Sequence, residues 1–552
     1  MKKISFKSLL AAILFLTQIQ GYSQTTCEHI NYQKELEGAK ISAAHSIGNI
    51  WFDSEFEKTF VYPKDRGIQV MRNGSFWLAG KKEDEEILAT AQFFDQYFPI
   101  AKSKWRPGPE STVESCENWN QHFSISSTDI NRFEQDLADG SIDLPIPSSV
   151  LGWPGNANPH FESIHGFNMP SRNYGFAPFE DNNNDGIYDP KKGDIPLTNG
   201  ASMTNWWLMN DFSSPTHLQP LEVELQVTAR SFNGSNVSLN NSIIYEVKII
   251  NRSDTKTNGV AFSILIGLDF GCDTDDFFGS SPEEDLVFIY NGDALDETDL
   301  SQCTEENSFG EEIPILGIKQ LKGFSGPDGE ALGLNSFIYF NRGVSNPPGN
   351  SLSPQNAQQK YNYMSGLWTD GSPIIADGEE TKFMFAGNPA NEEAPTLCRD
   401  ALPFDDRRLL INFGHFDLES GAQNTVSFSV TGVEDVPYPC PDISPLINRT
   451  AEVQEYWENS IINSVTKVSN NGYHTLKIQP NPASTNTTLI VEDGQKIKSV
   501  TVYNLNLQVI NSKSGNNMST MDLDLGLLDA GLYLINIETV DGYFYSEKLV
   551  KS

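Results

Sequence analysis

Side chains able to bind a metal ion are concentrated in one short stretch of the sequence. Asp181, Asn183 and Asp185 alternate along the chain, and Gly186 follows them directly. Alternating oxygen ligands that end in a glycine turn let the backbone wrap a hard cation such as Ca²⁺, and the carbonyl of Ile187 can supply a further oxygen. This spacing predicts a structural calcium-binding loop.

The far end of this loop differs from an EF-hand. An EF-hand places a bidentate Glu at its twelfth position, where this sequence has Lys192. We expect Asp189 and Asp194 to complete the ligand set instead, in a strand or coil context. The alternative is a turn rich in Asn and Asp, whose side chains hydrogen-bond to their own backbone.

A second acidic stretch carries four carboxylates, at Asp269, Asp273, Asp275 and Asp276. Carboxylates this dense repel one another unless a cation or solvent screens them. These residues are candidates for a second calcium site. An acidic, solvated loop is the alternative interpretation.

Other polar motifs lack the spacing of a known catalytic site. His160 and His165 do not form the HExxH zinc motif and are interpreted as ordinary loop histidines. Asp370 and Asp405–Asp406 could supply carboxylates for glycoside hydrolysis, but structural pairing with a neighbouring arginine is the simpler interpretation. Because no nucleophile elbow, phosphate-binding loop or dinucleotide motif is present, we expect no catalytic residues.

Aromatic residues offer a possible binding surface. Trp77, Trp206, Trp207 and Trp368 could form a flat platform for a ligand, although packing in the core is the expectation for tryptophan.

The chain is strongly acidic. Its 73 Asp and Glu against 38 Lys and Arg give a formal net charge of −35. This charge opposes binding to nucleic acid and to anionic lipid, which are polyanions, and favours solubility and divalent cations.

The N-terminus indicates export. A basic start, an apolar run from Leu9 to Leu16 and small residues before Gln24 predict a signal peptide at residues 1–23. The apolar run is too short to cross a bilayer, and no later stretch suggests a membrane span. All six cysteines follow the signal peptide, so we expect up to three disulfides, with the pairing open.

Strand patterns dominate the rest of the chain. Residues 221–227 alternate between apolar and polar, as a half-buried strand should, whereas helical patterns are limited to residues 130–139 and 451–462. The sequence predicts an all-β protein with a multi-domain β-sandwich ectodomain and a few short helices. The ectodomain spans residues 24–468 and is expected to contain two or more subdomains; a linker follows at residues 469–474.

The last segment, residues 475–552, shows seven short strand patterns, which predict a small Ig-like β-sandwich. Its motifs come in a specific order: Pro480-Asn481-Pro482, then Tyr503-Asn504, then Gly531 with Tyr533, and finally Lys548. In this order and at this C-terminal position, the segment resembles a type A sorting domain of the Bacteroidetes type IX secretion system. The resemblance implies recognition by the type IX machinery, cleavage within residues 468–473, and delivery to the cell surface or the extracellular space.

The ectodomain is similar, over about residues 60–433, to large uncharacterised surface proteins that carry the same sorting domain. The similarity rests on five motifs in a fixed order: Phe76-Trp77-Leu78-Ala79-Gly80, Pro107-Gly108-Pro109, Asn205-Trp206-Trp207, Tyr361-Asn362-Tyr363-Met364 with Trp368-Thr369-Asp370-Gly371, and Asp406-Arg407-Arg408. These relatives imply export and acidic loops of the calcium type, but no established reaction. We therefore expect a non-catalytic surface protein, adhesin-like or structural, with an extracellular glycan or protein as a possible ligand. The alternative is a secreted hydrolase that acts on glycans or peptides.

Overall fold

The computed structural model describes residues 33–47, 59–82, 85–91, 105–110, 112–172, 174–212, 220–272, 275–296, 304–341, 351–400, 407–467, 476–491, 496–503, 509–515, 518–526, 528, 530–540 and 544–551. The predicted signal peptide and the linker at residues 469–474 lie outside these ranges.

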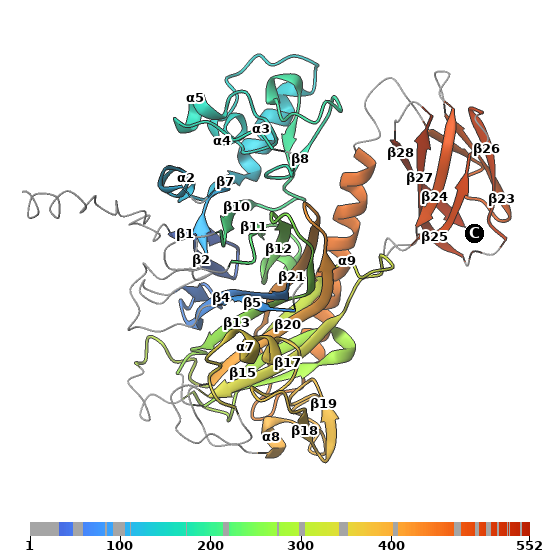
Figure 1. The fold of residues 1–552 in the computed structure, drawn as a ribbon. Coiled ribbons are helices and arrows are strands. Elements are labelled where there is room, and N and C mark those ends of the chain that lie inside the picture. The colour runs from blue at the N-terminus through green and yellow to red at the C-terminus, as the bar shows by residue number, and fades with distance from the viewer. Residues whose placement is uncertain are drawn as a thin grey trace, which may run out of the picture.

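Two large antiparallel sheets form the ectodomain (Figure 1). The first sheet has the order β1 (Gln33–Glu37), β2 (Ser42–Ser46), β3 (Phe60–Val61), β4 (Gln69–Lys81), β13 (Thr257–Leu268), β20 (Arg407–Leu418) and β17 (Leu334–Asn341), and β5 (Ile87–Thr90) pairs with β4. The second sheet has the order β14 (Asp276–Ser281), β15 (Leu286–Asn291), β16 (Ile315–Lys322), β21 (Gln423–Val433), β12 (Ser242–Asn251), β11 (Val223–Ser231), β10 (Met203–Asn210) and β6 (Arg106–Pro107), and β7 (Phe123–Ser126) pairs with β10. The predicted β fold is confirmed.

One apolar core lies between the two sheets. It joins Phe262 and Phe413 of the first sheet to Tyr245 and Phe428 of the second. The rings of Phe413 and Phe428 lie 5.8 Å apart, centroid to centroid, across the interface. Burial of large aromatic side chains from both sheets is the main stabilising term of such a sandwich.

Both faces of several strands are buried, because helices and loops cover the outer faces of the sheets. In β11, all nine residues are buried, although their sequence alternates between apolar and polar. The polar face is covered because Arg172 pairs with the buried carboxylate of Glu224. The prediction of a half-buried strand at residues 221–227 was therefore wrong in this respect.

Helix α9 (Ser444–Lys467) packs on the outer face of the second sheet through Val453 and Trp457. It begins seven residues before the predicted helix and contains that helix. Asp442 accepts a hydrogen bond from the N–H of Ser444 at 3.0 Å, and Pro445 occupies the first turn, where its missing N–H carries no cost. On the first sheet, α7 (Ala357–Met364) covers the outer face.

A smaller layer with its own aromatic core sits on one edge of the second sheet. Its elements are α2 (Val113–Trp119), α3 (Ser127–Leu137), α4 (Ser148–Leu151), α5 (Phe161–His165), β8 (Phe179–Glu180), η2 (Pro190–Lys192) and β9 (Ile195–Pro196). Helix α3 corresponds to the predicted helix at residues 130–139, and the hydroxyl of Ser126 caps it by accepting the N–H of Asp129 at 3.2 Å. We call this part the helical layer.

The remaining ectodomain elements are short: α6 (Val237–Asn240), η3 (Pro282–Glu284), β18 (Ile374–Ala376), β19 (Glu379–Thr381) and α8 (Leu397–Asp400). A disulfide joins Cys398 in α8 to Cys440, with 5.9 Å between the Cα atoms. Cys116 and Cys272 are also disulfide-bonded, whereas Cys27 and Cys303 lie outside the described residues. No helix in the described ranges is both long and apolar enough to cross a membrane.

The C-terminal segment forms two small antiparallel sheets around an apolar core. One sheet contains β22 (Leu476–Gln479), β23 (Asn486–Val491) and β26 (Thr520–Asp524). The other contains β25 (Val509–Ser514), β24 (Ile497–Tyr503), β27 (Gly531–Thr539) and β28 (Phe544–Lys551). These elements lie where the sequence predicts seven strands.

Candidate metal site and adjoining cleft

A two-stranded ribbon brings together the two ends of the acidic loop. In this ribbon, β8 and β9 pair antiparallel, so that Glu180 lies opposite Ile195. Asp181 directly follows one strand, and Asp194 directly precedes the other. The ribbon therefore places the first and last predicted metal ligands next to each other.

Between these ends the backbone turns sharply. Asn184 and Gly186 have φ angles of 58° and 72°, in the left-handed region that glycine and asparagine tolerate best. The carboxylate of Asp181 accepts the N–H of Gly186 at 2.7 Å, and that of Asp185 accepts the N–H of Ile187 at 2.9 Å. The acidic side chains thus hold the turn and point toward its inside.

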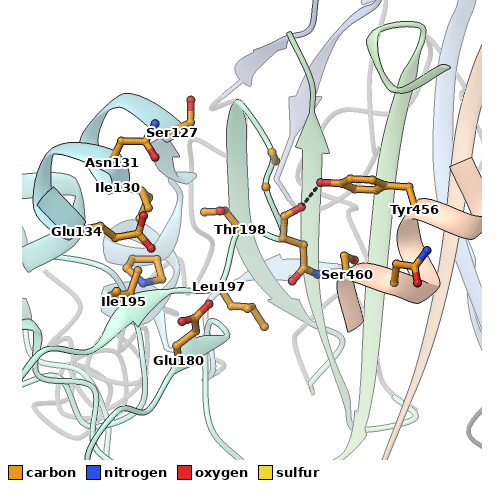
Figure 2. A pocket seen from close by; sticks show the side chains of 15 residues that line it. Ser127, Ile130, Asn131, Glu134, Glu180, Ile195, Leu197, Thr198, Tyr456 and Ser460 are labelled. Carbon is orange, nitrogen blue, oxygen red and sulfur yellow. Dashed lines mark hydrogen bonds between the residues drawn. The ribbon is translucent and has the colours of Figure 1, made fainter. Parts of the chain in front are cut away.

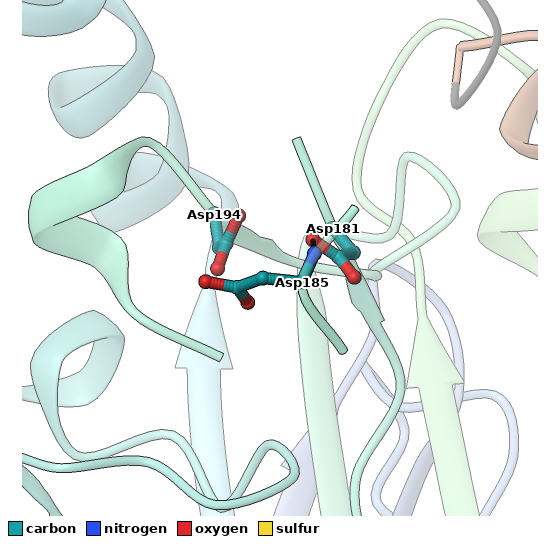
Figure 3. A group of neighbouring side chains, drawn as sticks. All are labelled: Asp181, Asp185 and Asp194. Atoms are coloured by element: carbon teal, nitrogen blue, oxygen red, sulfur yellow. Dashed lines mark hydrogen bonds between the residues drawn. The ribbon is translucent and has the colours of Figure 1, made fainter. Parts of the chain in front are cut away.

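The carboxylates of Asp181, Asp185 and Asp194 lie close together (Figure 3). Each offers a carboxylate oxygen, and these oxygens all lie within 4.8 Å of one another. A cluster of three carboxylates of this kind, which we call the Asp triad, could hold a metal ion. All of its donors are oxygens, which suits a hard divalent cation.

The most buried member of the triad is Asp194, whose exposed fraction is 0%. Burial raises the pKa of its carboxyl, and the charges of Asp181 and Asp185 raise it further, against the effect of two backbone hydrogen bonds. Those bonds come from the N–H groups of Asn182, at 2.9 Å, and Asp189, at 2.8 Å. A bound cation would offset both the burial cost and the repulsion.

Lys192 supplies a positive charge at the rim of the Asp triad. Its ammonium lies 2.9 Å from Oδ2 of Asp185. The hydrogen bond from Lys192 is the largest cause that lowers the pKa of Asp185. Lys192 therefore balances part of the negative charge of the site.

The other predicted ligands have different contacts. The carboxylate of Asp189 contacts Nε2 of His160 at 3.0 Å and accepts the N–H of Lys191. Asn183 forms hydrogen bonds with Asp185 within the loop, and Ile187 offers only its main chain. Of the six predicted calcium ligands, the structure gathers three carboxylates, and hydrogen bonds of the kind expected for an Asn- and Asp-rich turn are present as well.

The carboxylates of the second acidic stretch hydrogen-bond to separate partners. The amide of Gln69 donates to Asp269, Asp275 accepts from Asn291 at 2.7 Å, and Asp276 accepts the N–H of Phe270 at 3.2 Å. Asp273 lies outside the described residues. Within the part of the chain that the structure describes, a cluster of three possible ligands occurs only at the Asp triad.

The two histidines predicted to be ordinary have structural contacts. His160 directly precedes α5 and contacts Asp189, whereas His165 ends that short helix with Nε2 2.8 Å from the carbonyl of Gly152. Burial lowers the pKa of His165. Their segment is therefore a short helix rather than the loop that the sequence suggests.

The tryptophans do not form a surface platform. Trp77, Trp206 and Trp207 are buried in three different cores, and Trp368 is half-buried beside Tyr363. Their expected role in packing is the one that the structure shows.

A cleft of about 550 Å³ lies between the helical layer and α9. Glu134 of α3 and Glu180 of β8 line one side, and Tyr456 and Ser460 of α9 line the other (Figure 2). The hydroxyl of Tyr456 donates to the carbonyl of Asn199 at 2.8 Å. These residues come from separate segments without a recognisable motif, so the sequence gives no signal for the cleft.

In the C-terminal domain, Asn481 ties the first sorting motif to the last strand. Its side chain donates to the carbonyl of Lys548 and accepts the N–H of Val550 at 2.8 Å. Pro480 and Pro482 flank Asn481, and the carbonyl of Pro480 accepts the hydroxyl of Thr487 at 2.7 Å. The predicted motif residues thus meet at one edge of the domain.

The other motif residues lie on neighbouring strands. Gly531 pairs with Lys551 and Tyr533 with Leu549, between β27 and β28, and Tyr503 of β24 pairs with Leu534. Asn504 lies outside the described residues.

Comparison with known protein families identifies this domain. Residues 477–552 match the family model described as "Secretion system C-terminal sorting domain". The chain therefore ends in a sorting domain of the type IX system, as its motifs predict. A protein that carries this domain is exported across the outer membrane, to the cell surface or the extracellular space.

The ectodomain is not assigned to a family by comparison of the whole chain with known proteins. No curated protein matches it. A solved structure, a polysaccharide lyase, shares 6% identity, with 62% of this chain and 36% of that chain covered, at a TM-score of 0.17. The chain thus spans about a third of that protein's length, and a likeness at this TM-score carries no argument about the fold or the function.

Proposed function

We propose that this protein is a non-catalytic surface or extracellular protein, adhesin-like or structural, whose helical layer is stiffened by calcium. A signal peptide at residues 1–23 takes the chain through the inner membrane, and the sorting domain at residues 475–552 engages the type IX machinery.

The observation that supports the calcium part of the proposal is the proximity of the three carboxylates of the Asp triad at the closed end of the β8–β9 ribbon. Three carboxylates, one of them fully buried, lie close together, and Lys192 together with the backbone N–H groups offsets only part of their charge. A divalent cation would offset more of the repulsion. Calcium suits the site better than magnesium, because an irregular loop of carboxylates and carbonyls fits the larger ion with its variable geometry.

Removal of calcium tests this proposal. A ligand that binds only the folded state raises the melting temperature by mass action, so a chelator should lower that temperature and added Ca²⁺ should restore it. Asp185→Ala should abolish the response, whereas Asp254→Ala, at an exposed position away from the loop, should retain it. A wild-type melting temperature indifferent to chelator would contradict the proposal.

The cleft supports a second candidate, a secreted glycan hydrolase. Two carboxylates, from Glu134 and Glu180, line it, and paired carboxylates are the catalytic groups of most glycosidases. Release of reducing ends from a glycan by the wild-type protein, and its loss in both Glu134→Gln and Glu180→Gln, would favour this candidate over the non-catalytic role.

A further inference from the structure

We infer that the cleft between the helical layer and α9 binds a short segment of a neutral glycan. This inference rests on the proposed role as a binding protein at the cell surface, and it names the class of ligand. A volume of about 550 Å³ lies within the range of about 300–1,000 Å³ that is typical of small-molecule sites.

The charge of the lining disfavours anionic ligands. Glu134 and Glu180 contribute two carboxylates, and no Lys, Arg or His is among the residues that line the cleft. An anionic sugar or a phosphate would meet like charge here without a compensating cation, which disfavours its binding. The ligand is therefore neutral or cationic.

The uncharged polar groups of the lining favour a neutral ligand over a cationic one. Asn131, Asn199 and Asn459 supply amides, and Thr198 and Ser460 supply hydroxyls. Amides and hydroxyls both donate and accept hydrogen bonds, as sugar hydroxyls do, whereas the side chain of Lys or Arg only donates. A lining in which these groups outnumber the carboxylates matches a sugar better than a cationic side chain.

Asn199 lines the cleft and carries an acceptor without a partner in the described part of the chain. Its Oδ1 is buried and has no hydrogen-bond partner within the described residues. Its backbone is held in the left-handed region, with φ at 49°, and its carbonyl accepts the hydroxyl of Tyr456. A buried acceptor without a partner is costly. Because this oxygen has almost no accessible surface, the side chain must turn toward the cleft for a ligand hydroxyl to satisfy it.

Apolar side chains line the same space. Ile130, Ile195 and Leu197 lie among the polar groups and offer contact to the C–H face of a sugar ring (Figure 2). This mixture of an apolar surface with a few fixed polar groups is typical of a site that orients a small ligand.

The experiment uses the purified full chain and a set of short neutral gluco-, xylo-, manno- and galacto-oligosaccharides, measured by calorimetry. We expect at least one of them to bind, with an affinity that does not change with NaCl concentration, because no charge is neutralised. Asn199→Gly, which keeps the left-handed backbone but removes the amide, should weaken this binding about tenfold. Glu134→Gln should weaken it by no more than about fivefold, because an amide still accepts hydrogen bonds.

Two controls match these variants. Glu455→Gln, the control for Glu134→Gln, removes a carboxylate from an exposed position of α9. Gln135→Ala, the control for Asn199→Gly, removes an amide from an exposed position of α3. Neither position lines the cleft. Both should bind as the wild type does. Circular dichroism and melting of each variant show whether the fold is kept.

Three outcomes would overturn the inference: no binding to any of the oligosaccharides, equal binding by Asn199→Gly, or preferential, salt-sensitive binding of oligolysine that Glu134→Gln removes. Each leaves the calcium proposal intact, because that proposal is tested separately, by chelation and by calcium titration. If the wild type instead cleaves a bound oligosaccharide, the glycan site stands and the non-catalytic role fails.

Discussion

The ammonium of Lys192 lies 2.9 Å from the carboxylate of Asp185, in the position where an EF-hand would place its bidentate glutamate. The lysine therefore competes with a cation for one of the three carboxylates of the Asp triad. Removal of the lysine side chain should therefore strengthen metal binding.

We expect Lys192→Ala to raise calcium affinity about two- to fivefold, since the ion pair is partly exposed. Calcium titration by calorimetry measures the effect, with Lys191→Ala, an exposed neighbour, as the control. Unchanged or weaker binding by Lys192→Ala would argue against a metal at this position.

Two histidines buried in the sandwich predict sensitivity to acid. His45 has an exposed fraction of 0%, its Nε2 lies 2.8 Å from the hydroxyl of Tyr245, and burial lowers its pKa to about 3. His122 packs beside it, with ring centroids 6.4 Å apart, and burial lowers its pKa too.

The direction of the change in stability with pH follows from how the folded and unfolded chains bind protons. Above pH 6.5, these histidines are neutral whether the chain is folded or unfolded. Below that pH, the unfolded chain takes up protons that the folded chain does not, so stability falls as the pH falls from about 6.5 to about 3. For His45 this uptake of one proton corresponds to about 1.4 kcal/mol per pH unit, and His122 acts in the same direction. Urea unfolding across this range measures the slope, which His45→Gln should reduce by about one proton; an unchanged slope in that variant would contradict the assignment.

Loss of the hydrogen bonds made by the side chain of Asn481 should impair sorting. Its side chain connects the Pro480–Pro482 segment to β28 through two hydrogen bonds, so Asn481→Ala should destabilise the sorting domain by roughly 1–2 kcal/mol. We expect this variant to accumulate in the periplasm, and deletion of residues 475–552 to abolish surface delivery. Cell fractionation and immunoblotting measure both effects, and Asn486→Ala, at an exposed position of β23, is the control. Normal surface delivery of the deletion variant would refute the role of the domain.

The hydroxyl of Tyr456 leaves no room for a side chain at Gly200. Gly200 has a φ of 73°, and a Cβ placed there would lie 2.5 Å from Oη of Tyr456. Gly200→Ala should therefore destabilise the protein by about 2–3 kcal/mol, from the clash together with the unfavourable backbone. Tyr456→Phe should cost about 1 kcal/mol through the lost hydrogen bond to Asn199.

The double variant separates these two causes. In the Tyr456→Phe background the obstructing oxygen is gone, so Gly200→Ala should cost less there than in the wild type, and the two changes should not be additive. Chemical unfolding of the four proteins gives the coupling energy. Strict additivity would show that Tyr456 does not constrain the turn.

Local patterns in the sequence were sufficient to predict much of the fold. The strands of the sorting domain alternate and end at turn residues, and each of its motifs is a short local stretch in a fixed order, so both could be predicted without a structure. The oxygen spacing from Asp181 to Asp185 likewise predicts a loop closed on itself. Each of these features depends on residues close together in sequence.

Features that depend on distant residues could not be predicted. The alternation in β11 suggests one exposed face, but Arg172, about 50 positions earlier, covers Glu224. Asp189 has the correct spacing for a metal ligand, yet it turns to His160 instead. The cleft combines α3, the residues after β9 and α9, and no single segment of these carries a signal of its own.

The β8–β9 ribbon gives the metal site and the cleft a common wall, because Glu180 and Ile195 line the cleft while Asp181, directly after Glu180, and Asp194, directly before Ile195, belong to the Asp triad. Two ligands that order the same strands share the entropic cost of ordering them, so whichever binds first makes the other bind more tightly. This cooperativity is reciprocal: the factor by which the ion improves affinity for the second ligand equals the factor by which that ligand improves affinity for the ion. A chain of this design would therefore bind its second ligand more tightly where free calcium is plentiful.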